Sequence, residues 1–300
     1  MYTKQLNCVA VLILVCFLVT GCATTQKIAD DIMGKEPTLK KKIAFMPISN
    51  TDYKEKDLDK SATIALKAFV ERSCDSLVIT ESSPLLKALE EIPQSPPGHI
   101  DNLALAEAGR IYGLGAILEQ HIENIRHFTD KRGIWGFRKI HTFLQISLRI
   151  RVYDVETTSV LLDEIIEDEV EVPQETWQKS GDVSKLKNEI AQPLIVKIAN
   201  RMASIVCQRL SEVPWKGYIT SSTKATVNLS AGKDVGLTIG DILEVFAIGE
   251  PMKGPSQHVY LVPGPKIGEI KVAKVYEHHA EATSIFGDDL EKSTCVRVKP

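Results

Sequence analysis

The sequence predicts an α+β domain, a mixed sheet with flanking helices, followed by a small β-barrel domain. Before Val213-Pro214-Trp215, strand-like segments are interspersed with segments whose apolar residues recur every three or four positions. After it, short strands alternate with Gly-rich turns, and no long helical period is present. We therefore place an α+β domain at 42–211 and a β domain at 215–300, and we expect few contacts between them.

The first domain is predicted to begin with a strand over 42–47, because Pro47 and the turn formers after it end the apolar run. The most regular strand lies at 144–153, where apolar residues alternate with polar ones, so that one face is buried and the other is exposed. The other predicted elements are helices at 57–73, 83–92, 102–112 and 184–210, strands at 77–80 and at about 115–128 and 160–171, and a loop at 94–98. Pro193 lies inside the last helix, which therefore kinks or begins near Gln192.

The second domain is predicted from its turns. Strands are expected at about 217–220, 224–229, 241–247, 258–262, 266–276, 280–286 and 294–299. The Gly-rich stretch 232–241 lacks the Gly-Lys-Ser/Thr ending of a phosphate-binding loop and precedes a strand instead of a helix. We interpret its glycines as turn residues.

A short apolar segment at the amino terminus ends at a cysteine. Residues 8–19 carry no charge and would span roughly 18 Å as a helix, short of the ~30 Å hydrocarbon core. Such a segment is typical of a secretory signal peptide. Val19-Thr20-Gly21-Cys22 resembles the lipobox of bacterial lipoproteins, which implies cleavage before Cys22 and acylation of its thiol, and Ala23 fits transport to the outer membrane. We therefore predict a signal peptide at 1–21, a lipid such as palmitate on Cys22 and a flexible tether at 22–41; the alternative is a plain signal peptide.

Composition and cysteine spacing argue against nucleic-acid binding and against a metal site built from cysteines. A net charge of −3 gives no electrostatic case for nucleic acid. Beyond Cys22 the chain has Cys74, Cys207 and Cys295, and no two of them have metal-ligand spacing. We expect three buried, unpaired thiols; the alternative is a Cys74–Cys207 disulfide, because both cysteines end predicted helices.

Two longer segments of the chain resemble known protein families. Residues 42–210 resemble periplasmic lipoproteins related to the curli secretion lipoprotein and to the amino-terminal domain of TolB, through "KIAFMPISNT", "YGLGAILEQHIENI" and "ISLRIRVYDVETTSVLLDE". Residues 216–300 resemble the carboxy-terminal domain of flagellar assembly protein T, through "GYITSSTKATVNLSAGKDVGLTIGDILEVFAIGEPM" and "KIGEIKVAKVYEHHAEATSIFG". The second resemblance implies an SH3-like barrel.

The sequence lacks the common catalytic and metal-binding motifs. There is no H-E-x-x-H, G-x-S-x-G or C-x-x-C pattern. Glu119, His121 and Glu123 would share one strand face, and we interpret them as solvated residues instead of zinc ligands. We therefore predict no catalytic residue, cofactor or metal, and no enzymatic activity.

One segment combines basic and aromatic residues. Between Arg126 and His141, cations are interleaved with aromatic residues around two glycines. Three explanations stay open: the aromatics pack on their own domain, dock a protein partner, or contact lipid headgroups. The candidate partner-binding residues are Arg126, Lys131, Arg132, Trp135, Phe137, Arg138 and Lys139.

Together these patterns predict a non-enzymatic outer-membrane lipoprotein that faces the periplasm and acts as a scaffold or assembly factor of an envelope machine. The carboxy-terminal resemblance favours the flagellar basal body. Expected partners are the membrane, through Cys22, and envelope proteins, with a homo-oligomer also open. The alternative is a subunit of a curli-type secretion pore, which needs spanning strands of about 9–11 residues with an apolar lipid face. Residues 117–128 show no consistent apolar face.

Overall fold

The first domain is built around a five-stranded sheet with strand order β2-β1-β5-β6-β7. A computed structural model describes residues 39–47, 56–95, 99–173, 175–176, 183–223, 226–254, 258–287, 290 and 294–299; the predicted signal peptide, Cys22 and the tether as far as residue 38 lie outside them. The strands are β1 (Lys41–Phe45), β2 (Leu77–Ile79), β5 (Ala116–Arg132), β6 (Lys139–Asp154) and β7 (Val160–Glu171). β1 pairs in parallel with β2 and β5, whereas β5, β6 and β7 are antiparallel. The predicted mixed sheet is confirmed.

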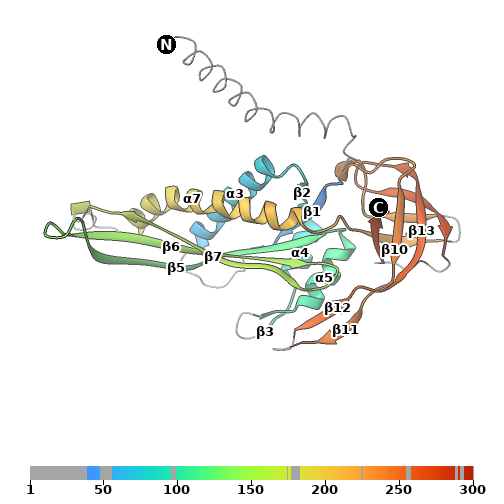
Figure 1. The fold of residues 1–300 in the computed structure, drawn as a ribbon, viewed down its shortest axis with the longest axis horizontal. Helices are drawn as coiled ribbons and strands as arrows, with labels where there is room; N and C mark the ends of the chain where they lie inside the picture. The colour runs from blue at the N-terminus through green and yellow to red at the C-terminus, as the bar shows by residue number, and fades with distance from the viewer. Residues whose placement is uncertain are drawn as a thin grey trace, which may run out of the picture. The chain divides into compact units, whose positions relative to one another are not determined.

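Helices cover both faces of this sheet. They are α3 (Lys56–Ser73), α4 (Ser83–Glu90), α5 (Asn102–Ile111) and α7 (Val183–Ser211). α3 and α7 lie over one face (Figure 1). The alternating apolar residues of β6 on that face, such as Ile146 and Ile150, are completely buried. α4 and α5 pack on the other face near β1, around Ile117 and Tyr153. The short strand β3 (Gln94–Ser95) occupies the first two residues of the predicted loop 94–98, and it pairs with β4 (His99–Ile100), which directly follows that loop.

α7 is the long helix of this core. It runs through Pro193 without ending there, so a start near Gln192 is wrong. Its segment Glu189–Ser211 is the one helix of the described ranges that is long and apolar enough to cross a membrane. Ile195, Ile198 and Met202 are completely buried against the sheet. A buried core helix meets the same test of length and composition.

A disulfide links α7 to the residue that follows α3. Cys74 and Cys207 are bonded, with their Cα atoms 5.6 Å apart. The prediction of unpaired thiols is therefore wrong for these two cysteines. They lie 133 positions apart in the sequence, and packing of α3 on α7 brings them together. Cys295 is buried and unpaired, as expected. Burial raises the pKa of its thiol to about 12, so it stays protonated at neutral pH.

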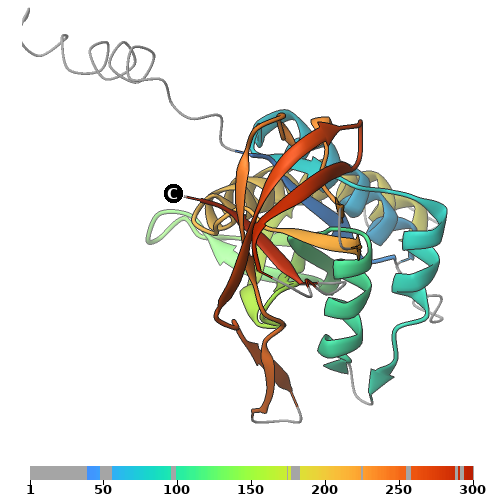
Figure 2. The same cartoon turned by 90° about the vertical axis from the view of Figure 1, so that its right-hand side faces the viewer.

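The second domain is a closed six-stranded barrel (Figure 2). Its strands follow the order β10-β13-β14-β9-β8-β15, and pairing of β10 with β15 completes the ring. They are β8 (Gly217–Ser222), β9 (Val227–Leu229), β10 (Ile242–Phe246), β13 (Lys266–Val275), β14 (Ala280–Phe286) and β15 (Cys295–Val298). Closure pairs the edges that an open sheet would expose. A barrel is thus confirmed, and its SH3-like character stays a prediction.

Two further features lie outside the ring. β11 (Glu250–Lys253) and β12 (Val259–Val262) form a separate hairpin; β11 was not predicted. The Gly-rich stretch forms the single turn η1 (Lys233–Val235) and the approach to β10. Gly236 and Gly240 have φ of +88° and +101° there, in the region that favours glycine. This agrees with their interpretation as turn residues.

The two domains share buried contacts, and Leu39–Pro300 forms one compact unit. Lys216 Nζ lies 2.7 Å from Asp154 Oδ1 and 2.9 Å from Glu156 Oε2, and Arg297 also pairs with Glu156. The side chains of Lys216 and Asp154 are only 5% and 2% exposed. The expectation of few contacts is therefore wrong. The β6–β7 turn, where Thr158 has φ of +63°, presents these carboxylates to the barrel.

Burial and ion pairing act in opposite directions on this cluster. Burial alone would raise the pKa of Glu156, but attraction to Lys216 and Arg297 outweighs it and lowers that pKa. Burial likewise opposes the charge of Lys216, and its two carboxylate partners raise its pKa above the ordinary value. Glu156, Lys216 and Arg297 are therefore charged at neutral pH. In these charged forms they hold the two domains together.

Candidate docking site

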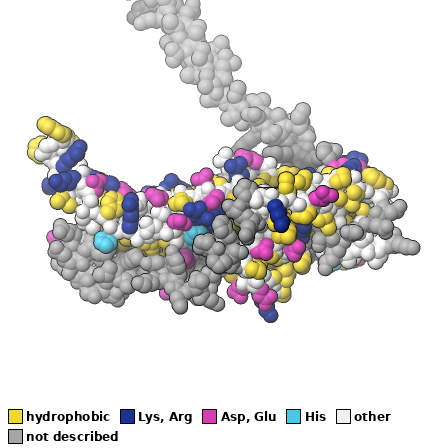
Figure 3. Space-filling view, turned by 90° about the horizontal axis from the view of Figure 1, so that it is seen from below, with side chains coloured by type: hydrophobic (Ala, Val, Ile, Leu, Met, Phe, Trp, Pro, Cys, Tyr) yellow, Lys and Arg dark blue, Asp and Glu magenta, His cyan; other side chains and the backbone are white. Residues whose placement is uncertain are grey.

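The most exposed apolar side chains of the described residues gather at the end of the β5–β6 hairpin. We call residues 131–140 the hairpin tip. Ile134, Trp135 and Phe137 are 82%, 88% and 84% exposed, and Ile140 is 66% exposed. In the space-filling view, hydrophobic and basic side chains meet at this end of the molecule (Figure 3). Packing of Trp135 on its own domain, one of the three explanations, is therefore wrong.

The turn is formed by its two glycines. Gly133 and Gly136 have φ of +127° and +91°, values that other residues rarely adopt. The N–H of Phe137 donates to the carbonyl oxygen of Ile134 at 2.9 Å, which closes the turn. Ile134 and Trp135 between the glycines, and Phe137 just after them, project from this tight bend and are exposed.

The strands just behind the turn are held by side-chain contacts. Phe128 stacks on Phe143 with ring centroids 5.5 Å apart, and the Arg132 guanidinium lies 3.8 Å from the centre of the Phe143 ring. Arg132 also pairs with Asp130 at 3.1 Å and with Glu169 of β7. These contacts tie the base of the tip to the edge strand, so the tip is carried on a well-packed support.

The structure divides the seven predicted partner-binding residues into two groups. Lys131, Trp135, Phe137, Arg138 and Lys139 lie in the tip and are exposed. Arg132 is also exposed, but its guanidinium pairs with acidic residues of its own sheet. Arg126 lies lower on β5, where it stacks over Phe128 and donates to Gln145. The first five can meet a partner directly, whereas Arg126 and Arg132 support the hairpin.

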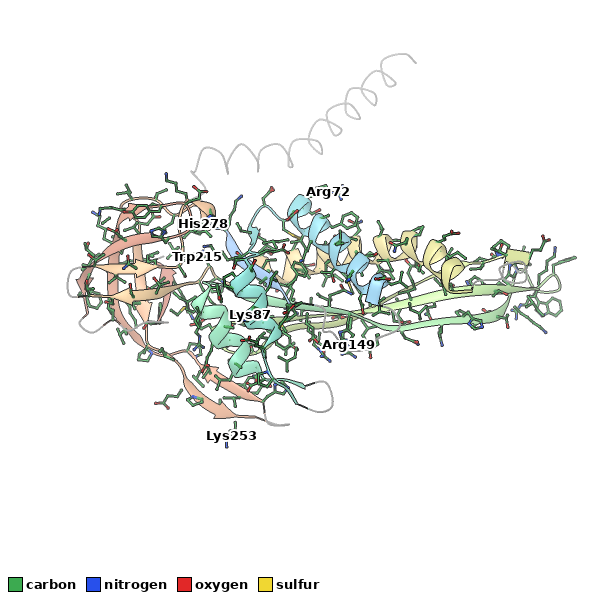
Figure 4. All side chains as sticks on the ribbon, turned by 180° about the vertical axis from the view of Figure 1, so that it is seen from behind. Arg72, Lys87, Arg149, Trp215, Lys253 and His278 are labelled. Carbon is green, nitrogen blue, oxygen red and sulfur yellow. A yellow bond between two sulfur atoms is a disulfide. The ribbon has the colours of Figure 1, made fainter. Side chains whose placement is uncertain are left out.

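Charges on the open face of the sheet pair across strands. Arg149 of β6 donates to Glu123 at 2.9 Å and to Asp163 at 2.8 Å (Figure 4). Arg151 contacts Glu119 at 3.4 Å, and it also reaches Asp163. The hydrogen bond from Arg149 lowers the pKa of Glu123. Such cross-strand pairs stabilise the long hairpin and neutralise the carboxylates weighed above as zinc ligands.

A cavity of about 650 Å³ lies between β2 and the barrel. Lys42 lines it, but its ammonium group donates to the carbonyl of Ser230 at 2.8 Å and pairs with Asp234 at 2.9 Å. Asp234 in turn accepts from His278 at 3.0 Å. This arrangement fastens β1 to the barrel.

Comparisons with known proteins give no family. No protein-family model and no curated protein matches the chain. Among solved structures, hypothetical protein CT253 from Chlamydia trachomatis is 14% identical and covers 58% of this chain and all of its own, with a TM-score of 0.37. The minor lipoprotein from Acinetobacter baumannii is 8% identical, covering 59% of this chain and 94% of its own at a TM-score of 0.29. Lipoprotein GNA1162 from Neisseria meningitidis is 12% identical, covering 53% and 99% at 0.27. Similarity at these TM-scores does not support a functional assignment.

Proposed function

We propose that this chain is a non-enzymatic outer-membrane lipoprotein that acts as a scaffold or assembly factor. Acylated Cys22 anchors it on the periplasmic side, and the hairpin tip engages a second component of the envelope. The single observation that carries the proposal is the exposure of three large apolar side chains among cations at that tip. Trp and Arg commonly dominate binding energy where such groups become desolvated.

The disulfide supports an envelope location. Bonds such as Cys74–Cys207 form and persist in oxidising compartments, including the bacterial periplasm, and are rare in the cytosol. The signal peptide and lipobox predicted at 1–22 would deliver the chain there. We propose the flagellar basal body as the machine, on the resemblance of residues 216–300, with envelope proteins among the partners.

The secretion-pore alternative is less well supported. A spanning hairpin needs one apolar face toward lipid. One face of β5 and β6 is covered by α3 and α7, and the other carries Glu123, Arg126 and Arg149. Along the described residues of this hairpin, the exposed apolar side chains lie in the tip, which is the part that can meet a membrane or a partner.

Deleting the gene and restoring it with variants tests the proposal. We expect loss of flagellar assembly, rescue by the wild-type gene, and no rescue by Cys22→Ala or by Trp135→Ser/Phe137→Ser. Ile239→Ser, which changes an apolar side chain 71% exposed on the barrel domain, is the matched control and should rescue. Normal flagella in the deletion strain would refute the flagellar role, and loss of secretion alone would favour the pore. Acyl-chain labelling unchanged by Cys22→Ala would refute the anchor.

A further inference from the structure

We propose that the hairpin tip inserts into a membrane leaflet that contains anionic phospholipids. This inference rests on the proposed function and names the component that the tip engages. The chain would then contact membrane at two places, through the acyl group of Cys22 and through a protein wedge. Protein partners of the machine would bind elsewhere on the chain.

The outer layer of the tip is apolar and convex. Ile134, Trp135 and Phe137 point from a tight turn and are each more than 80% exposed. A projecting turn offers no groove in which a partner's side chain could be enclosed. It does suit the boundary between headgroups and acyl chains, where Trp and Tyr concentrate and where apolar faces bury to about 5–10 Å.

The next layer is cationic. Lys131, Arg138 and Lys139 are exposed directly behind the apolar turn, where Lys131 pairs in register with Ile140 and Arg132 with Lys139. No acidic residue lies between 131 and 140. Arg132 is neutralised by Asp130 and Glu169, so three cations face outward. An apolar layer followed by cations matches the order of acyl chains and anionic headgroups along the bilayer normal.

The length of the hairpin allows this insertion. Phe143 is the last buried residue of β6 before the tip, and Lys139 lies four residues beyond it. At about 3.3 Å per residue, the cations project roughly 13 Å past the buried region and the apolar turn projects further. The charged face of the sheet therefore stays in water while the apolar turn enters the leaflet.

Vesicle binding by the mature chain, residues 22–300 with Cys22→Ala, tests the inference without the lipid anchor. This chain keeps the whole compact unit Leu39–Pro300. The vesicles contain phosphatidylcholine alone or mixed with phosphatidylglycerol, and brominated acyl chains report contact by quenching tryptophan fluorescence. We expect binding that requires phosphatidylglycerol and weakens with salt. All of these chains also carry Trp177→Phe, so that Trp135 and the buried Trp215 are the tryptophans that remain. In this background Trp135→Phe should retain binding and lose quenching.

Matched variants test the contributions of the cationic layer and of the apolar layer to vesicle binding separately. Lys131→Gln/Lys139→Gln should weaken binding about 25-fold, at roughly five-fold per cation near an anionic surface. Lys253→Gln/Lys271→Gln removes two exposed cations of the barrel domain, one of which lies on the β11–β12 hairpin (Figure 4), and should change binding less than two-fold. Trp135→Ser/Phe137→Ser should abolish detectable co-sedimentation with the vesicles, whereas Trp135→Phe should not.

Absence of binding, or equal binding to vesicles without phosphatidylglycerol, overturns the inference. If tip variants nevertheless fail in envelope assembly, the tip binds a protein and the proposed function stands. If the tip variants also rescue assembly, the proposed function falls with the inference.

Discussion

Replacing Lys216 by Met should be among the most damaging single changes in the barrel domain. The substitution keeps most of the side-chain volume but removes the charge that lies between Asp154 and Glu156. Removing one partner of a buried ion pair typically costs about 3–5 kcal/mol, because the remaining charge is buried without compensation. Glu156 keeps Arg297, and Asp154 still accepts from the N–H and the hydroxyl of Thr157. We therefore expect about 3 kcal/mol at neutral pH, the lower end of the range.

A matched control distinguishes burial from charge. Lys266 also pairs with two carboxylates, Glu244 and Glu269, but its side chain is 33% exposed. Lys266→Met should cost less than about 1 kcal/mol, as exposed pairs do. The measurement is urea unfolding of residues 22–300, followed by circular dichroism. Equal losses for the two variants would refute the reasoning, and separate transitions for the two domains in the wild type would show that the cluster does not couple them.

The pH dependence follows from the two pKa shifts. Glu156 has a folded pKa below its ordinary 4.5, so its stabilisation is present above that value and is lost as the pH falls. Lys216 has a folded pKa above 10.5, so its stabilisation is present below that value and is lost as the pH rises further. The difference between wild type and Lys216→Met should therefore be largest between these limits and should shrink as the pH falls below 4.5 and Glu156 becomes protonated, because a neutral carboxyl needs no cation. A difference that does not vary with pH would contradict the assignment.

Three further predictions concern aromatic and cysteine residues. Trp135→Ala should change the free energy of unfolding by less than about 1 kcal/mol, as at most exposed sites, whereas Trp215→Ala, 8% exposed in the barrel core, should cost about 3–5 kcal/mol in the same denaturant titration. Cys74→Ser/Cys207→Ser should cost about 2–5 kcal/mol and remove the sensitivity of the thermal melt to reductant; an unshifted melting temperature would show that the bond is dispensable. Cys295 should resist alkylation at neutral pH until the chain unfolds, since its thiol is buried with a raised pKa, and rapid labelling of the native chain by mass spectrometry would refute this.

Local patterns were enough to predict most of the sheet and its helices. The alternation at 144–153 and the helical spacing of 57–73 depend on neighbouring residues, and both elements are present. The hairpin was predicted too short, because β5 and β6 continue to Arg132 and from Lys139 through charged and aromatic residues that do not alternate. Their extension depends on pairing between the two strands, which a single strand's pattern does not contain.

The site was predicted in composition but not in geometry. The sequence identified the cations and aromatics between 126 and 141, and exposure of Trp135 then eliminated packing on the domain. Arg132 could not be assigned to the support, because its partner Glu169 lies 37 positions away on β7. The cluster around Lys216 was missed for the same reason, since Asp154 is 62 positions away.

For the exported lipoprotein that we propose, the bond between Cys74 and Cys207 would constrain the order of events during export. It encloses β2, α4, α5 and all of β5, β6 and β7 within one loop. A chain that crosses the inner membrane from its amino terminus presents Cys74 to the periplasm long before Cys207 arrives. During that interval Cys22 would be the nearest thiol available for a wrong bond, and acylation of Cys22 would remove it. Attachment of the lipid would thus protect the later oxidation, so blocked acylation should produce mispaired Cys22–Cys74 chains as well as unanchored ones.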